Sequence, residues 1–140
     1  MKLWIVTGVA GAAIVAGAAF AAPQPSPLGE APPSGASLAT GQCFRSQDIR
    51  SHRIGDRSTL LLNVRGKEAY RVTMKGACLA GATETDPIIT RSPPGSTIIC
   101  KPIDLDIAIS KGGFATPCIV DSIVRMSPEQ VAALPKKLKP

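Results

Sequence analysis

The chain has 140 residues and a formal net charge of +6, from 16 Lys and Arg against 10 Asp and Glu. This length suffices for one domain with a single core and excludes two ordinary domains. A single His argues against a zinc site built from His pairs, and few aromatic rings leave few platforms for stacking bases, so no nucleic-acid partner is expected.

The N-terminal residues have the form of a secretory signal. Lys2 precedes an apolar run over residues 3–19, and Ala19-Phe20-Ala21 is a small-x-small cleavage motif. We therefore interpret residues 1–21 as a signal peptide and expect the protein to be periplasmic or secreted. About 20 apolar residues can also span a bilayer, so an uncleaved anchor is the alternative.

The next segment, 22–42, contains five prolines among Ala, Ser and Gly and shows no apolar periodicity. Such a composition predicts a flexible linker, because it buries too little to offset the entropy of ordering. The folded domain is expected over 43–134, followed by a basic tail over 135–140 that contains three lysines.

Apolar residues recur with a period of two inside the domain, which predicts strands. In residues 68–75, alternate apolar side chains share one face. A strand over 58–64 precedes this one across Arg65-Gly66-Lys67, so the two form a predicted hairpin. Because Leu60, Leu61 and Leu62 are consecutive, we expect the first strand to be covered on both faces. Further strands are predicted over 48–54, 97–101, 103–110 and 118–126.

One short helix is predicted after these strands. Ser127 is a suitable N-cap, Pro128 suits the first helical position, and Gln130 completes a capping box. A helix of two turns is not stable alone, so it should dock through Val131 and Leu134. The predicted fold is mainly β: a small antiparallel sheet or partly open barrel of about six strands with one C-terminal helix.

All four cysteines lie in the domain, at positions 43, 78, 100 and 118. An even number at wide spacing predicts two disulfides in an oxidising compartment, with free buried thiols as the alternative. Three connectivities are open. Similar residues follow Cys43 and Cys118, which favours a bond between these two and a second between Cys78 and Cys100.

Several short motifs follow one another along the domain: Cys43-Phe44, Ile49-Arg50, Thr59-Leu60-Leu61, Tyr70-Arg71-Val72, Cys78, Cys100, Cys118-Ile119 and Met126-Ser127-Pro128-Glu129. Over residues 42–134 this order resembles a group of small exported bacterial proteins catalogued only as a domain of unknown function. The resemblance implies an exported all-β domain with no known activity. Members tend to carry an aromatic residue where this chain has His52, which implies a packing role for that position.

His52 is the one candidate for a general base near neutral pH. Ser46, Ser51 or Ser58 could serve as a nucleophile beside it, which defines a small hydrolase as one alternative function. No nucleophile elbow or phosphate-binding loop occurs in the chain. We expect His52 to be a half-exposed strand residue.

Asp104 and Asp106 alternate with apolar residues in the predicted strand over 103–110. On one strand face their carboxylates would lie roughly 7 Å apart, which suits a hard cation such as calcium, with Asp121 as a further ligand. A metal-dependent enzyme is thus another alternative. A solvated strand face explains the same pattern, and we expect no metal or other cofactor.

The connection over 86–97 is polar and contains Arg91-Ser92-Pro93-Pro94-Gly95. It lies within the loop that a bond between Cys78 and Cys100 would close. Small inhibitors present a contact residue on such a stiffened loop, so a protease or enzyme inhibitor with Arg91 as contact residue is an alternative function.

Residues 43–78 hold eight basic and three acidic side chains, a local charge of +5. The bases of the predicted hairpin, Arg65, Lys67, Arg71 and Lys75, would form an outward cluster that can bind phosphate or carboxylate groups. We therefore expect a non-enzymatic exported binding or structural domain. Its partner would be a protein or an anionic envelope component, including a membrane surface.

Overall fold

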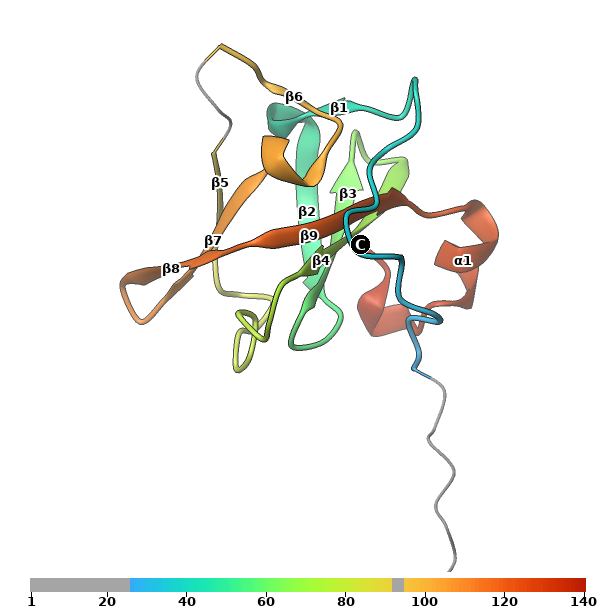
Figure 1. The fold of residues 1–140 in the computed structure, drawn as a ribbon. Helices are drawn as coiled ribbons and strands as arrows, with labels where there is room; N and C mark the ends of the chain where they lie inside the picture. The colour runs from blue at the N-terminus through green and yellow to red at the C-terminus, as the bar shows by residue number, and fades with distance from the viewer. Residues whose placement is uncertain (1–25, 92–94) are drawn as a thin grey trace, which may run out of the picture.

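The computed structural model describes residues 26–91 and 95–140. This part of the chain contains nine strands in three antiparallel sheets and one α-helix, so the fold is mainly β (Figure 1). The strands are β1 (Phe44–Arg45), β2 (Ile49–Ile54), β3 (Thr59–Val64), β4 (Glu68–Met74), β5 (Ile88–Arg91), β6 (Ile98–Ile99), β7 (Asp106–Lys111), β8 (Phe114–Cys118) and β9 (Val120–Arg125). The helix α1 is Pro128–Ala133, and three short 3-10 helices are η1 (Ser46–Asp48), η2 (Pro102–Asp104) and η3 (Lys136–Leu138).

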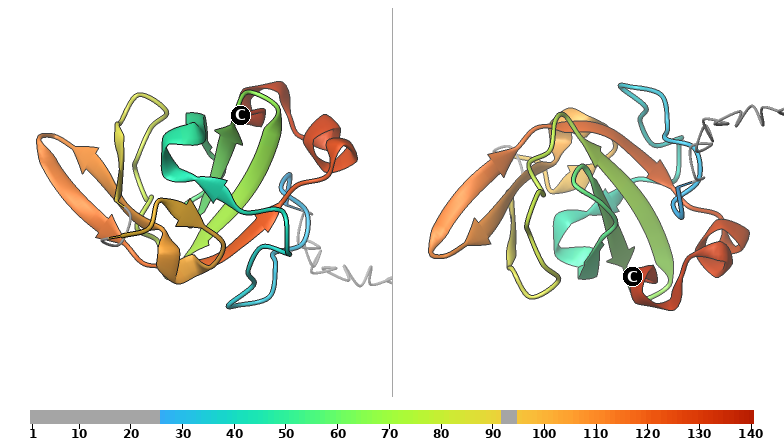
Figure 2. Two further views of the ribbon diagram at one scale, coloured as in Figure 1. Left: turned by 90° about the horizontal axis from the view of Figure 1, so that it is seen from above. Right: turned by 90° about the horizontal axis from the view of Figure 1, so that it is seen from below.

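The two larger sheets have the strand orders β2-β3-β4-β9 and β5-β7-β8, and β1 pairs with β6 in a third. Only Ile119 separates β8 from β9, so the chain passes directly from one large sheet into the other. The sheets do not close into a barrel. Figure 2 shows the β7–β8 hairpin extending to one side of the molecule, with α1 on the opposite side.

The hairpin of β3 and β4 is confirmed, with Val64 opposite Glu68 and Thr59 opposite Thr73. Arg65 and Gly66 both have positive φ, 56° and 74°, a conformation typical of tight hairpin turns. This geometry sets the register and thereby decides which side chains enter the core.

The core has two parts, one on each face of β3 and β4. The larger part lies inside the curved sheets and includes alternate residues of both strands: Leu60, Leu62, Val64, Tyr70, Val72 and Met74. The smaller part lies on the opposite face, where Leu61 and Ala69 pack with Met126 and Leu134. Both faces of β3 are therefore covered, as its three consecutive leucines predict.

The helix α1 begins as predicted. Ser127 accepts a hydrogen bond from the Gln130 backbone N–H at 3.3 Å, and the Gln130 side chain accepts one from the Ser127 N–H at 2.8 Å. Val131 and Leu134 pack against the smaller core, so the predicted docking is confirmed.

The segment predicted to be a flexible linker is packed against the domain over its described part, residues 26–42. The Ile123 N–H donates to the Ala36 carbonyl at 2.9 Å, and the Leu38 N–H donates to the Cys100 carbonyl at 2.8 Å. Leu28 is buried in the smaller core. This segment is held because strand β9 offers it a free edge and the sheet face offers an apolar site. Residues 22–25 and the predicted signal peptide lie outside the described residues.

The residues after α1 also lie against the domain and are not a detached tail. Leu138 in η3 is buried, and the Asn63 side-chain amide donates to the Pro140 carbonyl at 3.2 Å. The lysines at 136, 137 and 139 are exposed.

The prediction of two disulfides is confirmed, but the favoured connectivity is wrong. Cys43 is bonded to Cys100 and Cys78 to Cys118, with Cα–Cα distances of 4.7 and 5.6 Å. The first bond follows from the pairing of β1 with β6, which puts residues 43 and 100 opposite each other. The second arises because the Lys75 N–H binds the Ile119 carbonyl, which brings the chain after β4 beside Cys118.

Two strand predictions also need correction. The segment expected to begin a strand at residue 103 instead forms η2, and β7 starts only at Asp106. The Asp104 carboxylate accepts hydrogen bonds from the backbone N–H groups of Cys100 and Lys101, which favours the tight turn over an extended chain. Part of the expected connection over 86–97 is strand β5, which pairs with β7.

Candidate functional site

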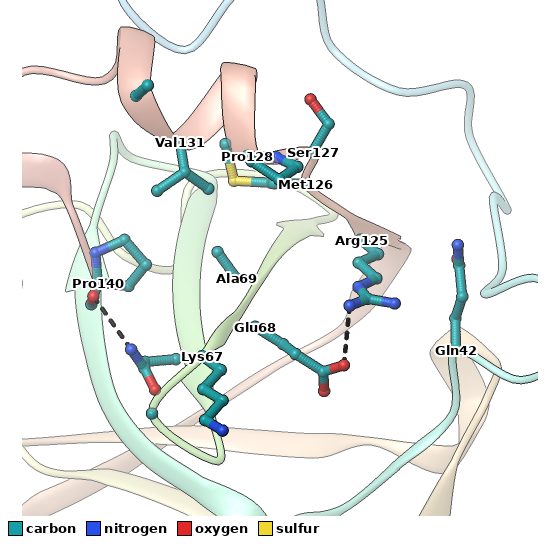
Figure 3. A pocket seen from close by; sticks show the side chains of 13 residues that line it. Gln42, Lys67, Glu68, Ala69, Arg125, Met126, Ser127, Pro128, Val131 and Pro140 are labelled. Carbon is teal, nitrogen blue, oxygen red and sulfur yellow. Dashed lines mark hydrogen bonds and ion pairs between the residues drawn. The ribbon is translucent and has the colours of Figure 1, made fainter.

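A groove of about 680 Å³ lies between the β3–β4 turn, the end of β9 and helix α1 (Figure 3). Its volume falls in the range of small-molecule sites. Turn and strand residues form one wall, and the helix with its preceding residues forms the other. The lining residues are Gln42, Asn63, Gly66, Lys67, Glu68, Ala69, Arg125, Met126, Ser127, Pro128, Val131, Ala132 and Pro140.

The side of this groove near α1 is apolar. Figure 3 shows Ala69, Met126, Pro128 and Val131 gathered there. Ala69 and Met126 also belong to the smaller core, and the Met126 N–H donates to the Ala69 carbonyl at 2.9 Å. The apolar wall is thus continuous with the packed interior and is held by backbone hydrogen bonds.

The opposite side is charged. Arg125 forms an ion pair with Glu68 at 2.8 Å, and Arg65 approaches the other Glu68 oxygen at 3.9 Å. Arg65 also pairs with Asp48 at 3.0 Å. Lys67 lies between Arg65 and Glu68 in the sequence. Its ammonium group has no ion-pair partner among the residues that the structure describes. One cation at the groove is therefore uncommitted.

Tyr70 supports the charged side from within the core. Its hydroxyl donates to the Gln42 carbonyl at 3.0 Å and lies 3.5 Å from a Glu68 oxygen. Burial, together with the nearby Glu68 charge, raises the pKa of the Tyr70 hydroxyl. The hydroxyl stays protonated at neutral pH, so it serves as a donor that fixes the chain at Gln42.

The four bases predicted to bind anions do not form one cluster. Arg65 and Lys67 lie in the β3–β4 turn, whereas Lys75 follows the opposite end of β4 and lines a different groove. Arg71 is buried, and its guanidinium donates to the carbonyls of Leu28 and Glu30. The prediction that Arg71 points outward to solvent is wrong because the N-terminal segment covers that face.

His52 lies in β2 opposite Leu62 and is half-buried. Burial lowers the pKa of its imidazole, while a hydrogen bond with the Asp86 backbone acts in the opposite direction. Its Nε2 has no hydrogen-bond partner among residues 26–91 and 95–140, so none of the serines described there reaches this nitrogen. Ser46 and Ser51 line a small cleft between β2 and β5 together with His52. The Ser58 hydroxyl donates a hydrogen bond to Asp56.

The two aspartates considered for calcium are not a pair. Asp104 caps η2 with its carboxylate, and Asp106 begins β7 in an exposed position. Over residues 26–91 and 95–140, no group of three or more His, Cys, Asp or Glu side chains could hold a metal ion. Asp121 accepts a hydrogen bond from the Ser34 hydroxyl at 2.7 Å.

Arg91 ends β5 and is exposed. Cys78 and Cys100 are bonded to other cysteines, so the connection that follows Arg91 lies within the longer loops closed by the 43–100 and 78–118 bonds and not in a short loop of its own. The stiffened inhibitor-like loop predicted from sequence therefore lacks its expected closing bond. Residues 92–94 of that loop lie outside the described residues.

Comparison with known proteins shows the family. The model of DUF6491, a family of unknown function, matches residues 1–139, so this chain belongs to that family. No curated protein and no solved structure matches the chain. The family membership agrees with the resemblance seen in the cysteine and strand motifs.

Two further observations bear on the compartment. Both disulfides are of the kind that form and persist in an oxidising, extracellular environment. Among the described residues, none of the helices has the length and apolar character needed to cross a bilayer.

Sequence reasoning identified Arg65 and Lys67 but missed Gln42, Glu68 and Arg125 as parts of one site. Gln42 lies in the segment predicted as a linker, and in the sequence Glu68 contributes only one of the three acids of residues 43–78. The register of β4 with β9 places Tyr70 opposite Arg125, which carries Arg125 toward Glu68. That pairing joins strands about 50 residues apart and has no local signal.

Proposed function

We propose that this protein is a non-catalytic exported binding domain and that the groove beside α1 is its binding site. The observation that carries the proposal is the groove itself, which joins an apolar wall to a charged wall on a stable sheet. Sites of this kind bind small molecules through apolar contact and orient them through a few polar groups.

The walls of the groove support a preformed site. Strand β4 is hydrogen-bonded to β3 on one side and β9 on the other. The opposing wall begins at a capped helix whose Leu134 is buried in the smaller core. Because both walls are fixed by packing, little ordering is needed on binding.

The compartment that we propose is the periplasm or the cell exterior. The support is the apolar N-terminal sequence with its Ala19-Phe20-Ala21 motif, together with the two disulfides. A partner in the cell envelope follows from that location.

Site-specific photocrosslinking in native cells tests the proposal. A photoreactive phenylalanine is placed at Ala132, an exposed groove residue, and in a matched protein at Phe114, which is 79% exposed on β8. We expect the probe at Ala132 to capture a component that the probe at Phe114 does not capture. We also expect Val131→Arg, which fills the apolar side, to abolish that capture.

Identical products from both positions, or no product from Ala132, would contradict a binding role for the groove. Capture that persists with Val131→Arg would also place the contact elsewhere. Near-unchanged unfolding midpoints for all three variants are required, so that lost capture reports on the groove and not on folding.

A further inference from the structure

We propose that the protein has a second binding surface, a basic face that contacts the anionic headgroups of a lipid bilayer. The basic face consists of Arg53 in β2 and of Lys136, Lys137 and Lys139 in the C-terminal segment. None of these four residues lines the groove beside α1, so this surface is separate from the proposed binding site.

The C-terminal segment brings the three lysines beside β2. Its Leu138 is buried in the smaller core with Leu61, and η3 contacts β2. Arg53 lies opposite Leu61 in the pairing of β2 with β3. Directly opposed residues of antiparallel strands place their side chains on the same face of the sheet, so Arg53 lies on the face that η3 covers. Because Leu138 points inward, the lysines on both sides of it are exposed.

This surface carries an excess of positive charge. Strand β2 and residues 135–140 together contain five basic side chains and no acidic one, and the terminal carboxylate of Pro140 lowers the sum of these charges to +4. Within the described residues, none of the five bases forms an ion pair. The charge of this face is therefore not neutralised by the protein itself.

The acids that flank β2 in the sequence are engaged by other groups. Asp48 pairs with Arg65 at 3.0 Å. Asp56 accepts hydrogen bonds from the Ser58 backbone N–H at 2.7 Å and from the Ser58 hydroxyl at 3.0 Å. Neither carboxylate contacts a lysine of the C-terminal segment.

The described chain begins on the same side of the molecule. Leu28 belongs to the same small core as Leu138 and packs against Gly55, the residue after β2. Figure 2 shows this start and the C-terminal end on the side of α1, opposite the β7–β8 hairpin. Only residues 20–25 separate Ser26 from the apolar run over 3–19, and a segment of that length spans at most about 20 Å. While the apolar run is in the bilayer, the basic face is therefore held close to the headgroups.

The kind of basic side chain also favours a lipid surface. Three of the four bases are exposed lysines, whose ammonium groups act as point charges on flexible stems and need no fixed partner geometry. Such groups suit mobile headgroups, whereas interfaces between proteins are depleted in Lys. The attraction of a basic side chain to an anionic bilayer acts within a Debye length, about 8 Å at physiological salt.

Cosedimentation with lipid vesicles tests the proposal. The protein is purified after export, in the form predicted to begin at Ala22, which contains every residue that the structure describes. One set of vesicles is phosphatidylcholine alone, and the other is an equimolar mixture of phosphatidylcholine and phosphatidylglycerol. We expect binding to the mixture only, and release as the NaCl concentration rises, because salt screens exposed charges.

Two triple variants locate the contact. Replacing Lys136, Lys137 and Lys139 together by Gln should weaken binding to the mixed vesicles about 100-fold, from about 1 kcal/mol for each lysine near the surface. The matched control replaces Lys75, Lys101 and Lys111 by Gln, which removes the same charge from exposed positions outside the basic face. The control should stay within about threefold of the wild type, because charges beyond a Debye length are screened. Thermal unfolding verifies that both variants are folded.

Equal binding to both kinds of vesicle, no binding to either, or equal losses in the two triple variants would overturn the membrane contact. Retention on dextran sulfate without binding to vesicles would identify an anionic polymer as the ligand and would also refute the lipid surface. Photocrosslinking at Ala132 tests the groove separately, because that residue lines the groove and does not belong to the basic face.

Discussion

Arg71 is a buried residue whose guanidinium, within the described part of the chain, donates to backbone carbonyls and not to a carboxylate. Burial lowers the pKa of this side chain, and the Asp56 charge partly offsets that effect. Arginine is the basic side chain best suited to such a place, because it has five donors and stays charged. By holding Leu28 and Glu30, Arg71 fixes the N-terminal segment against β4 and removes itself from the surface.

His52 should give the domain a measurable pH dependence. Because burial lowers the pKa of His52 below its usual value of about 6.5, the unfolded chain binds more protons than the folded one just below that pH. We expect the free energy of unfolding to be fully developed above about pH 7 and to fall as the pH is lowered through about 6.5. Urea unfolding at pH 7.5 and 5.5 measures this change.

His52 is the chain's one histidine, so the assignment is direct. In His52→Gln the difference in unfolding free energy between the two pH values should shrink. Nearby Arg53 and Glu84 act on the imidazole in opposite directions and remain in the variant. An undiminished difference in the variant would show that another group titrates in this window.

The helix α1 is short and lies at one side of the molecule, yet it forms one wall of the groove (Figure 2). Its six residues cannot form a stable helix in isolation. Its stability comes from the capping box at its start and from Leu134 at its end. The groove therefore depends on a helix that the rest of the domain holds in place.

Replacing Ser127 should loosen this wall. In Ser127→Ala the Gln130 N–H loses its acceptor, so we expect a loss of about 1 kcal/mol in the free energy of unfolding. We also expect faster hydrogen exchange at Gln130, measured by NMR. Ser51→Ala, in an exposed position of edge strand β2, is the control and should change stability by less than about 0.5 kcal/mol. Similar losses in both variants would contradict the capping role.

Across the whole molecule, the two disulfides close loops that overlap in sequence. Cys78 lies between Cys43 and Cys100 in sequence, and Cys100 lies between Cys78 and Cys118. One bond joins the start of the domain to the chain after β6, and the other joins the chain after β4 to the end of β8. The first bond lies beside the β1–β6 sheet, and the second links the sheet that contains β4 to the sheet that contains β8.

Removing one bond should destabilise the domain substantially. The bond between Cys78 and Cys118 closes 40 residues, so its loss in the double variant Cys78→Ala, Cys118→Ala should cost about 2 to 4 kcal/mol. Urea unfolding measures this loss, and peptide mapping of the native protein should show the 43–100 and 78–118 links. An unchanged unfolding midpoint, or a mapped link between 43 and 118, would contradict this arrangement.

Features that depend on near neighbours follow from the amino-acid sequence. The β3–β4 hairpin follows from alternating side chains around a turn that needs positive φ, and the start of α1 follows from Ser127, Pro128 and Gln130. The family resemblance also arises from motifs of this kind. Each depends on residues within a few positions of one another, so local physics is sufficient.

Contacts between distant segments, in contrast, depend on how the whole domain folds. Arg71 alternates like a surface residue, and its burial depends on Leu28, which packs from more than 40 positions away. Similar residues after Cys43 and Cys118 suggested a bond that strand pairing does not permit. The groove likewise exists because β9 pairs with β4 and brings Arg125 to Glu68. A local pattern shows which residues form strands, but which strands pair depends on packing energies summed over the whole domain.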